Sequence, residues 1–202
     1  MKAVKKALFG LGKGGGTFTI KKVLRTSMII PMKWIGGAVG TIWTIKDFLD
    51  IWFSAEKRAI AAGKDLAKTI INTNYFQDHQ ISLIAFSLGT RVVVECLKEL
   101  SKLEDRPLIQ NVYLLGGATP NSPEKFEDGF QVPHGRIVNA ISHRDKVLKK
   151  IFNSIPFKAT SIGTSKIEHA RVENIDLTST INGHTKYMPN LDSVLEKINY
   201  IP

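Results

Sequence analysis

Cysteine is scarce in this chain of 202 residues, with Cys96 as its single example. One cysteine excludes an intramolecular disulfide framework, a redox-active cysteine pair and a cysteine-rich zinc site, and it is compatible with a reducing compartment. We expect neither a metal nor another cofactor. Charged residues make up 23% of the chain and hydrophobic residues 43%. These proportions exclude wholesale disorder and allow one domain with a sizeable core.

Acidic residues are absent from the first 46 residues, which contain nine of the 28 basic ones. The rest of the chain carries 19 basic and 18 acidic residues and is nearly neutral. We therefore divide the chain into a basic N-terminal segment, 1–46, that associates with a membrane surface or a partner protein, and a domain, 47–202. We expect no nucleic-acid binding, because the basic excess is confined to one end and no recognised nucleic-acid module follows it.

A long uninterrupted hydrophobic run is also lacking. The most apolar stretch, 28–45, contains Pro31 and Lys33 and falls short of the roughly 20 apolar residues of a membrane span. It predicts either contact with a membrane or a hydrophobic helical hairpin packed on the body or on a partner. The glycine-rich run LGKGGGTF lacks the spacing of a phosphate-binding loop and predicts a flexible joint. We expect an intracellular, membrane-associated protein, with a mitochondrial membrane among the alternatives.

Helical and strand patterns alternate along the remaining chain. Strands separated by helices predict parallel βαβ units, and therefore an α/β fold with a parallel sheet flanked by helices. Such sheets place their chemistry at the carboxyl ends of the strands. The expected strands are 81–86, 112–117, 137–142 and 172–177, and the expected helices are 47–73, 90–103, 146–152 and a last one from about 190.

The first strand runs into the pentapeptide Ala85-Phe86-Ser87-Leu88-Gly89, which is typical of a nucleophile elbow. The small residues Ala85 and Gly89 would let the strand and the following helix approach closely, so that Ser87 stands on a sharp turn. The backbone amide of Leu88 would then help to stabilise an oxyanion. The alternative is that Ser87 only caps the helix that follows.

A serine nucleophile needs a base and an orienting acid, which follow it in the order acid, histidine in α/β hydrolases. Asp145 follows the third expected strand, and His184 lies in a glycine-containing loop before the last helix. We expect Ser87, Asp145 and His184 to form a catalytic triad, with Asp176 as the reserve candidate for the acid. The other histidines fit this order and position less well: His79, His134, His143 and His169.

From about Asp47 to its end the chain resembles the α/β-hydrolase-like family of transmembrane-and-coiled-coil-domain-containing protein four. The resemblance rests on four segments: LIAFSLGTRVVVECLKEL, NVYLLGGATP, GRIVNAISHRDKVL and ENIDLTSTINGHTKYM. It implies a membrane-associated Ser-Asp-His hydrolase or a lipase-like fold. The family's motifs fall on Ser87, Leu115 to Ala118, Gly135, Arg136, Asn139, Ser142, Asp145, Glu173, Asn174, Asp176, Gly183 and His184.

The chain departs from this family pattern in two places. Ala85 stands where the family's elbow usually begins with glycine, and no clear strand before Ile81 carries a second oxyanion donor. Either Gly36 and Gly37 supply that donor or the site is incomplete. The leading hypothesis is a serine hydrolase acting on lipid or another apolar ester. The rival is a catalytically inactive hydrolase fold that serves as a structural or interaction subunit of a membrane complex, a mitochondrial complex being one candidate.

Overall fold

The computed structural model describes residues 45–201 except 74–75, 77–78, 104–108 and 155–159. The expected features of residues 1–44 lie outside this part of the chain. They comprise most of the basic segment, the glycine-rich joint, nearly all of the apolar stretch and the candidate donors Gly36 and Gly37.

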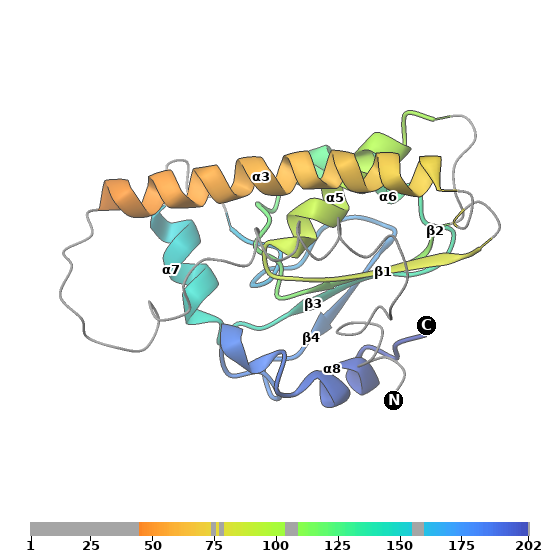
Figure 1. Cartoon of the computed structure of the whole chain (residues 1–202). Helices are drawn as coiled ribbons and strands as arrows, with labels where there is room; N and C mark the ends of the chain where they lie inside the picture. Colours follow the sequence, from red (N-terminus) through yellow and green to blue (C-terminus); the bar gives the residue numbers. More distant parts are fainter. Residues whose placement is uncertain (1–44, 74–75, 77–78, 104–108, 155–159, 202) are drawn as a thin grey trace, which may run out of the picture.

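The described residues form one parallel sheet whose four strands follow each other in chain order (Figure 1). This arrangement confirms the predicted α/β fold with helices flanking a parallel sheet. The second strand begins at Ile109, three residues before its predicted start, and the first is as predicted. The strands are β1 (Ile81–Phe86), β2 (Ile109–Leu115), β3 (Ile137–Ile141) and β4 (Val172–Asp176).

Burial along the strands explains their composition. All five residues of β3 are buried, as are six of the seven in β2, and both strands are rich in apolar residues because layers cover the sheet on both faces. Side chains alternate between the faces, so Val112 and Leu114 join one cluster while Tyr113 and Leu115 join another. The outer strands β1 and β4 are only partly buried.

Helices pack in layers on the two faces of the sheet (Figure 1). Right-handed crossovers between strands in chain order place the connecting helices on the same face. Accordingly α5 (Gly89–Leu100) and α6 (Glu127–Phe130), which follows the short η2 (Pro123–Lys125), lie together on one face. Helix α3 (Ile45–Asn72) packs on α5. Helix α7 (Lys146–Ser154) lies beside the first turns of α3. Helix α8 (Leu191–Lys197) lies on the opposite face of the sheet.

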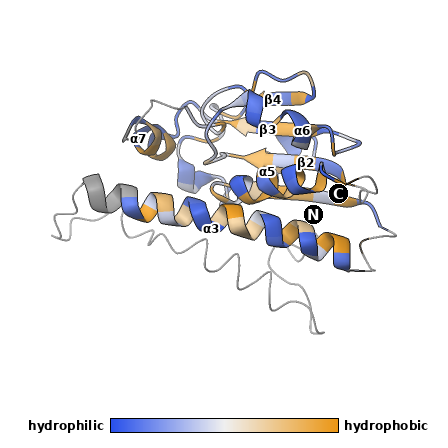
Figure 2. Cartoon of the chain, turned by 90° about the horizontal axis from the view of Figure 1, so that it is seen from above, coloured by the Kyte–Doolittle hydropathy of each residue, from blue (hydrophilic) through white to orange (hydrophobic). Residues whose placement is uncertain are grey.

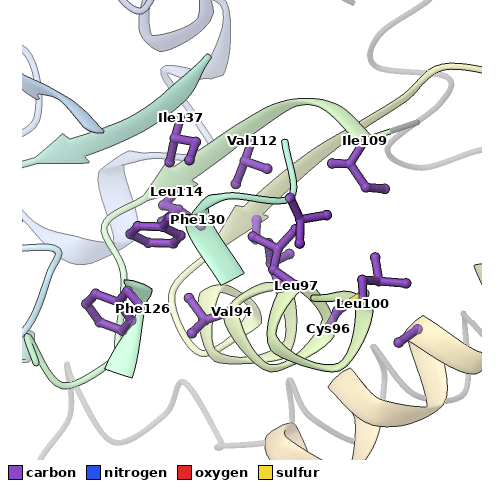
Figure 3. Close-up of a cluster of buried hydrophobic side chains, with 14 of the residues drawn as sticks. Val94, Cys96, Leu97, Leu100, Ile109, Val112, Leu114, Phe126, Phe130 and Ile137 are labelled. Atoms are coloured by element: carbon purple, nitrogen blue, oxygen red, sulfur yellow. The ribbon is translucent and has the colours of Figure 1, made fainter. Parts of the chain in front are cut away.

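The largest hydrophobic cluster lies between α5 and the sheet (Figure 3). Leu97 and Leu100 of α5 meet Ile109 and Val112 of β2 there, and all four are fully buried. Burying a side chain of this size contributes about 1.5–3 kcal/mol, so this cluster is a main source of the stability of the fold. A second cluster on the opposite face joins the sheet to α8.

Helix α3 is amphipathic, and hydrophilic and hydrophobic residues alternate along it (Figure 2). Trp52, Ala55, Ala59 and Ala62, spaced three or four residues apart, are buried. A Cβ at Gly63 would lie 2.5 Å from the carbonyl oxygen of Val92, so the crossing of α3 and α5 requires glycine there.

The start of α3 at Ile45 is two residues earlier than predicted. The division of the chain at residues 46 and 47 stays a prediction. In the described part of the chain, no helix has the length and apolar character needed to cross a bilayer.

Candidate active site

The carboxyl ends of the strands are aligned in one row. Phe86 of β1 pairs with Leu115 of β2, Leu115 pairs with Ala140 of β3, and Ala140 pairs with Ile175 of β4. Because the strands are parallel, the segments that follow them meet at one edge of the sheet. We call this edge the carboxyl edge.

Ser87 stands on a strained turn at this edge, between β1 and α5. Its φ of +54° is uncommon for a residue with a side chain. The backbone holds this conformation, because the Ser87 amide donates to the carbonyl of Leu115 at 3.0 Å and the Ser87 carbonyl accepts from the amide of Ala118 at 3.0 Å. The Gly116-Gly117-Ala118 loop after β2 therefore clamps the turn.

The alternative that Ser87 caps the helix is wrong. Helix α5 begins at Gly89, its N-cap residue is Leu88, and no side chain caps it. A Cβ at Gly89 would lie 3.8 Å from the Cβ of Ala85, so the two small residues face each other where the strand turns into the helix. Alanine in place of glycine at position 85 is therefore accommodated.

Two buried threonines support the turn and were not singled out from the sequence. The hydroxyl of Thr90 donates to the carbonyl oxygen of Ser87 at 2.7 Å and lies 2.8 Å from the hydroxyl of Thr119. Because the single Thr90 proton is used on Ser87, Thr119 donates to Thr90. The sequence signal for Thr90 is a hydroxyl three residues after the elbow serine, and for Thr119 the sequence offers none.

Replacing Thr90 by valine should destabilise the fold by about 1–3 kcal/mol, because the shape is kept while the Thr119 hydroxyl loses its buried partner. Urea unfolding measures this change. The matched control is Thr69→Val on α3, where the lost hydroxyl donates to the Asp65 carbonyl in an exposed setting. Equal effects of the two substitutions would contradict the proposed support of the turn.

His184 connects Ser87 to Asp145. Its Nε2 lies 2.8 Å from the Ser87 Oγ, and its Nδ1 lies 2.6 Å from the Asp145 Oδ2. An ionised carboxylate only accepts hydrogen bonds, so Nδ1 carries the proton of the neutral ring and Nε2 is left to accept from the Ser87 hydroxyl. The structure thus brings together the three residues singled out in the sequence, in the order that a proton relay requires.

Asp145 is fully buried and uses both carboxylate oxygens. While Oδ2 faces His184, Oδ1 accepts a hydrogen bond from the amide of Leu148 at 3.0 Å, as a cap of α7 does. The acid is therefore fixed by the helix that follows it.

Ser142, one residue after β3, ties the turn of the acid to the loop of the histidine. Its hydroxyl donates to the carbonyl of Ile181 at 2.5 Å and accepts from the amide of Arg144 at 3.2 Å. Ser142 is itself fully buried. This link accounts for the Ser-x-x-Asp pattern at positions 142 and 145.

Aromatic rings hold the imidazole from one side. The rings of Phe86 and His184 stack with their centroids 4.8 Å apart, and Tyr187 packs against Phe86 at 5.3 Å. Burial raises the pKa of Tyr187, so its hydroxyl stays protonated. Gly116 has a φ of +47°, and a Cβ there would lie 2.7 Å from the Tyr187 ring, so this position requires glycine.

The reserve acid Asp176 serves its own loop. Its Oδ1 accepts from the amide of Thr178 at 2.8 Å, and hydrogen bonding to Thr178 lowers the pKa of Asp176. Its Oδ2 lies 3.8 Å from His143. His169 has a mostly buried ring that lies 3.3 Å from Glu127, away from the triad.

The Leu88 amide lies at the start of α5, where an oxyanion would benefit from the helix dipole. Among the described residues, no group accepts a hydrogen bond from this amide. Its side chain is buried in a cluster with Trp52, Leu148 and Phe152, which fixes the backbone there. The second oxyanion donor expected at Gly36 or Gly37 lies outside the described residues. Within them, no group of three His, Cys, Asp or Glu side chains could hold a metal ion.

Comparison with known proteins finds one family. The model of the family described as "Protein of unknown function (DUF726)" matches residues 16–201. The chain is 32% identical over 160 residues to "Transmembrane and coiled-coil domain-containing protein STS1" of Oryza sativa subsp. japonica, covering 78% of this chain and 24% of that protein. It is 36% identical over 149 residues to "Probable lipase MIL1" of Saccharomyces cerevisiae, covering 73% of this chain and 14% of that protein.

An uncharacterized membrane protein of Caenorhabditis elegans is 29% identical over 151 residues, covering 73% of this chain and 24% of that protein. The chain thus spans less than a quarter of the length of each of these relatives. No solved structure matches it. The name of the rice relative agrees with the family resemblance found in the sequence motifs.

Proposed function

This chain belongs to the family described as protein of unknown function DUF726, and we propose that it has a lipase-like function, that of a membrane-associated serine ester hydrolase. Ser87 is the nucleophile, His184 the base and Asp145 the acid that orients the histidine. The fold is in this proposal a small α/β-hydrolase-like domain, with residues 1–46 as the segment that meets a membrane surface or a partner.

The observation that carries the proposal is the continuous relay from Ser87 to Asp145. Both heavy-atom separations, 2.8 and 2.6 Å, are of hydrogen-bond length. A serine, a histidine and a buried acid in this order are the arrangement by which a hydroxyl becomes a nucleophile. The strained backbone of Ser87 adds support, since such strain is concentrated at active sites.

The chemistry follows from the relay. The Ser87 oxygen attacks the ester carbonyl while its proton moves to the His184 Nε2, and the Leu88 amide stabilises the oxyanion. The intermediate collapses, the carbon–oxygen bond to the alcohol breaks, and His184 returns the proton to the departing alcohol. Water, activated by the same histidine, then attacks the acyl group on Ser87, breaks its ester bond to the serine oxygen and releases the carboxylic acid product. Asp145 stabilises the imidazolium in both halves of the reaction.

Relatives support the class of substrate and the location in a coarse way. A yeast relative is named a probable lipase, and others are named transmembrane or membrane proteins. These names support an apolar ester substrate and association with a membrane. The alternative of a mitochondrial membrane stays a prediction.

A fluorophosphonate probe tests the proposal, because the activated serine displaces fluoride and forms a stable bond to phosphorus. We expect the folded full chain to be labelled, the label to map to the peptide that contains Ser87, and heat-denatured protein to give no label. A well-folded chain that resists labelling, both in detergent and with lipid present, would overturn the proposal.

One observation favours a second candidate. In the described part of the chain no strand precedes β1, whereas such hydrolases take their second oxyanion donor from the loop after an earlier strand. The second candidate is therefore a catalytically inactive hydrolase fold that acts as a structural or interaction subunit of a membrane complex. A folded chain that binds membranes but remains unlabelled would favour it.

A further inference from the structure

Three exposed basic residues lie close in the chain to the acid of the triad. Arg144 and Lys146 flank Asp145 in the chain, Lys149 lies one turn further along α7, and all three side chains are exposed. Among the described residues, none of these three is within 4.0 Å of a carboxylate. The basic cluster, defined as Arg144, Lys146 and Lys149, therefore presents positive charge to solvent at the carboxyl edge.

The geometry of α7 directs this charge outward. Lys146 and Lys149 are three residues apart and share one face of the helix. Leu148 and Phe152, which are four residues apart, form the side of α7 that is buried against α3, whereas both lysines are exposed. Because the Lys149 amide donates to the backbone carbonyl of Asp145, the cluster is held within about one helical turn, roughly 5 Å along the axis, of the triad acid.

Exposed apolar side chains lie on the first turns of α3, the helix that packs against α7. Trp52 of α3 packs edge-on against Phe152 of α7, with the ring centroids 5.7 Å apart. Its two neighbours in the chain, Ile51 and Phe53, are 36% and 44% exposed. The first turns of α3 and the whole of α7 lie side by side (Figures 1 and 2). Exposed apolar side chains on one helix, packed against another helix that carries exposed basic side chains, are the composition of an interfacial membrane-binding surface.

We propose that the carboxyl edge docks on an anionic lipid bilayer, with the basic cluster against lipid phosphates and Ile51 and Phe53 in the interface. The nucleophile, the base and the acid then all lie at the docked edge. The substrate is accordingly an ester carried by lipid in that bilayer. This last step rests on the proposed function, whereas docking does not, so the two are tested separately.

Vesicle binding tests docking without hydrolysis, using the full chain with Ser87→Ala. Each basic residue near an anionic surface adds roughly fivefold to the partition coefficient. Changing the basic cluster to glutamine should therefore lower the partition onto phosphatidylcholine–phosphatidylserine vesicles roughly 100-fold. The matched control changes Lys68, Lys98 and Lys197 to glutamine. These exposed residues lie on α3, α5 and α8, so their substitution removes the same number of charges at other places on the surface.

The control triple should lower binding less than about tenfold, well short of the loss from the basic cluster. Equal losses in the two triples would overturn the proposal, because net charge alone would explain them. Equal binding to pure phosphatidylcholine vesicles would overturn it as well.

A label at position 53 reports insertion. Cys96 is fully buried, and burial raises the pKa of its thiol to about 12, so a polarity-sensitive thiol dye attaches selectively to Phe53→Cys. Its emission should shift to the blue with anionic vesicles, and an unchanged spectrum would contradict insertion. Vesicle binding without any fluorophosphonate label would keep the docking and sink the hydrolase proposal.

Discussion

Replacing Ser87 or His184 by alanine should each lower the kcat for ester hydrolysis by a factor of about 10⁴ to 10⁶, because nucleophile and base act as one unit. Steady-state hydrolysis of a short-chain chromogenic ester by the full chain measures this. The double variant should be no slower than either single one, since removing either residue already abolishes the relay from Ser87 Oγ through His184 Nε2.

Additive losses in the double variant would contradict the relay. Ser87→Ala removes a hydrogen bond in a partly exposed site and should change the unfolding free energy little. His184→Ala also leaves the buried Asp145 Oδ2 without its partner and should lower the unfolding free energy. His143→Ala is the control for the histidine, because His143 is exposed, lies near the edge and contacts Asp176 and not the triad. It should retain activity within about twofold of the original chain.

Changing Asp145 to asparagine should lower kcat by a factor of about 10⁴, although it only replaces one carboxylate oxygen by an amide nitrogen. An asparagine oxygen can still cap α7 through the Leu148 amide, so the helix is kept. The amide nitrogen would then face the His184 Nδ1 and donate to it. The ring proton must move to Nε2, which can no longer accept the proton of Ser87.

The loss should therefore appear in kcat with the fold intact, as judged by circular dichroism and urea unfolding. The matched control is Asp176→Asn, which removes the other carboxylate of the carboxyl edge, the reserve candidate. It should leave kcat nearly unchanged, because Asp176 contacts Thr178 and His143. A larger effect of Asp176→Asn than of Asp145→Asn would show that Asp145 is not the acid of the triad.

Much of the fold could be predicted because the strand signals are strong. Segments such as 112–115 are continuous apolar runs, and their place in the buried middle of a parallel sheet demands that composition. The start of β2 was missed because Gln110 and Asn111 interrupt the apolar pattern. Asn111 is nevertheless buried, since its side-chain oxygen accepts from the amide of Arg136. The segment with η2 and α6 was also missed, because its helices are too short for periodicity to detect.

The positions of the three candidate triad residues could be predicted because parallel strands bring their carboxyl ends together wherever the loops begin. The supporting contacts could not. Thr119, Ser142 and Tyr187 act through packing and hydrogen bonds with segments that are far away in the chain. Ser142 and its partner Ile181, for example, are 39 positions apart. No local pattern encodes such partners, because they depend on how the loops after β2, β3 and β4 meet.

The strand order has a consequence for how the molecule loses activity. Ser87 follows β1 and His184 follows β4, the two outer strands of the described sheet, whereas the most deeply buried strands are β2 and β3. Outer elements open locally at a lower free energy than a central pair does. Fraying at either side separates nucleophile from base while the central strands stay folded. Breaking the relay therefore takes less free energy than unfolding the whole domain, and we expect mild denaturant to inactivate the protein before it unfolds globally.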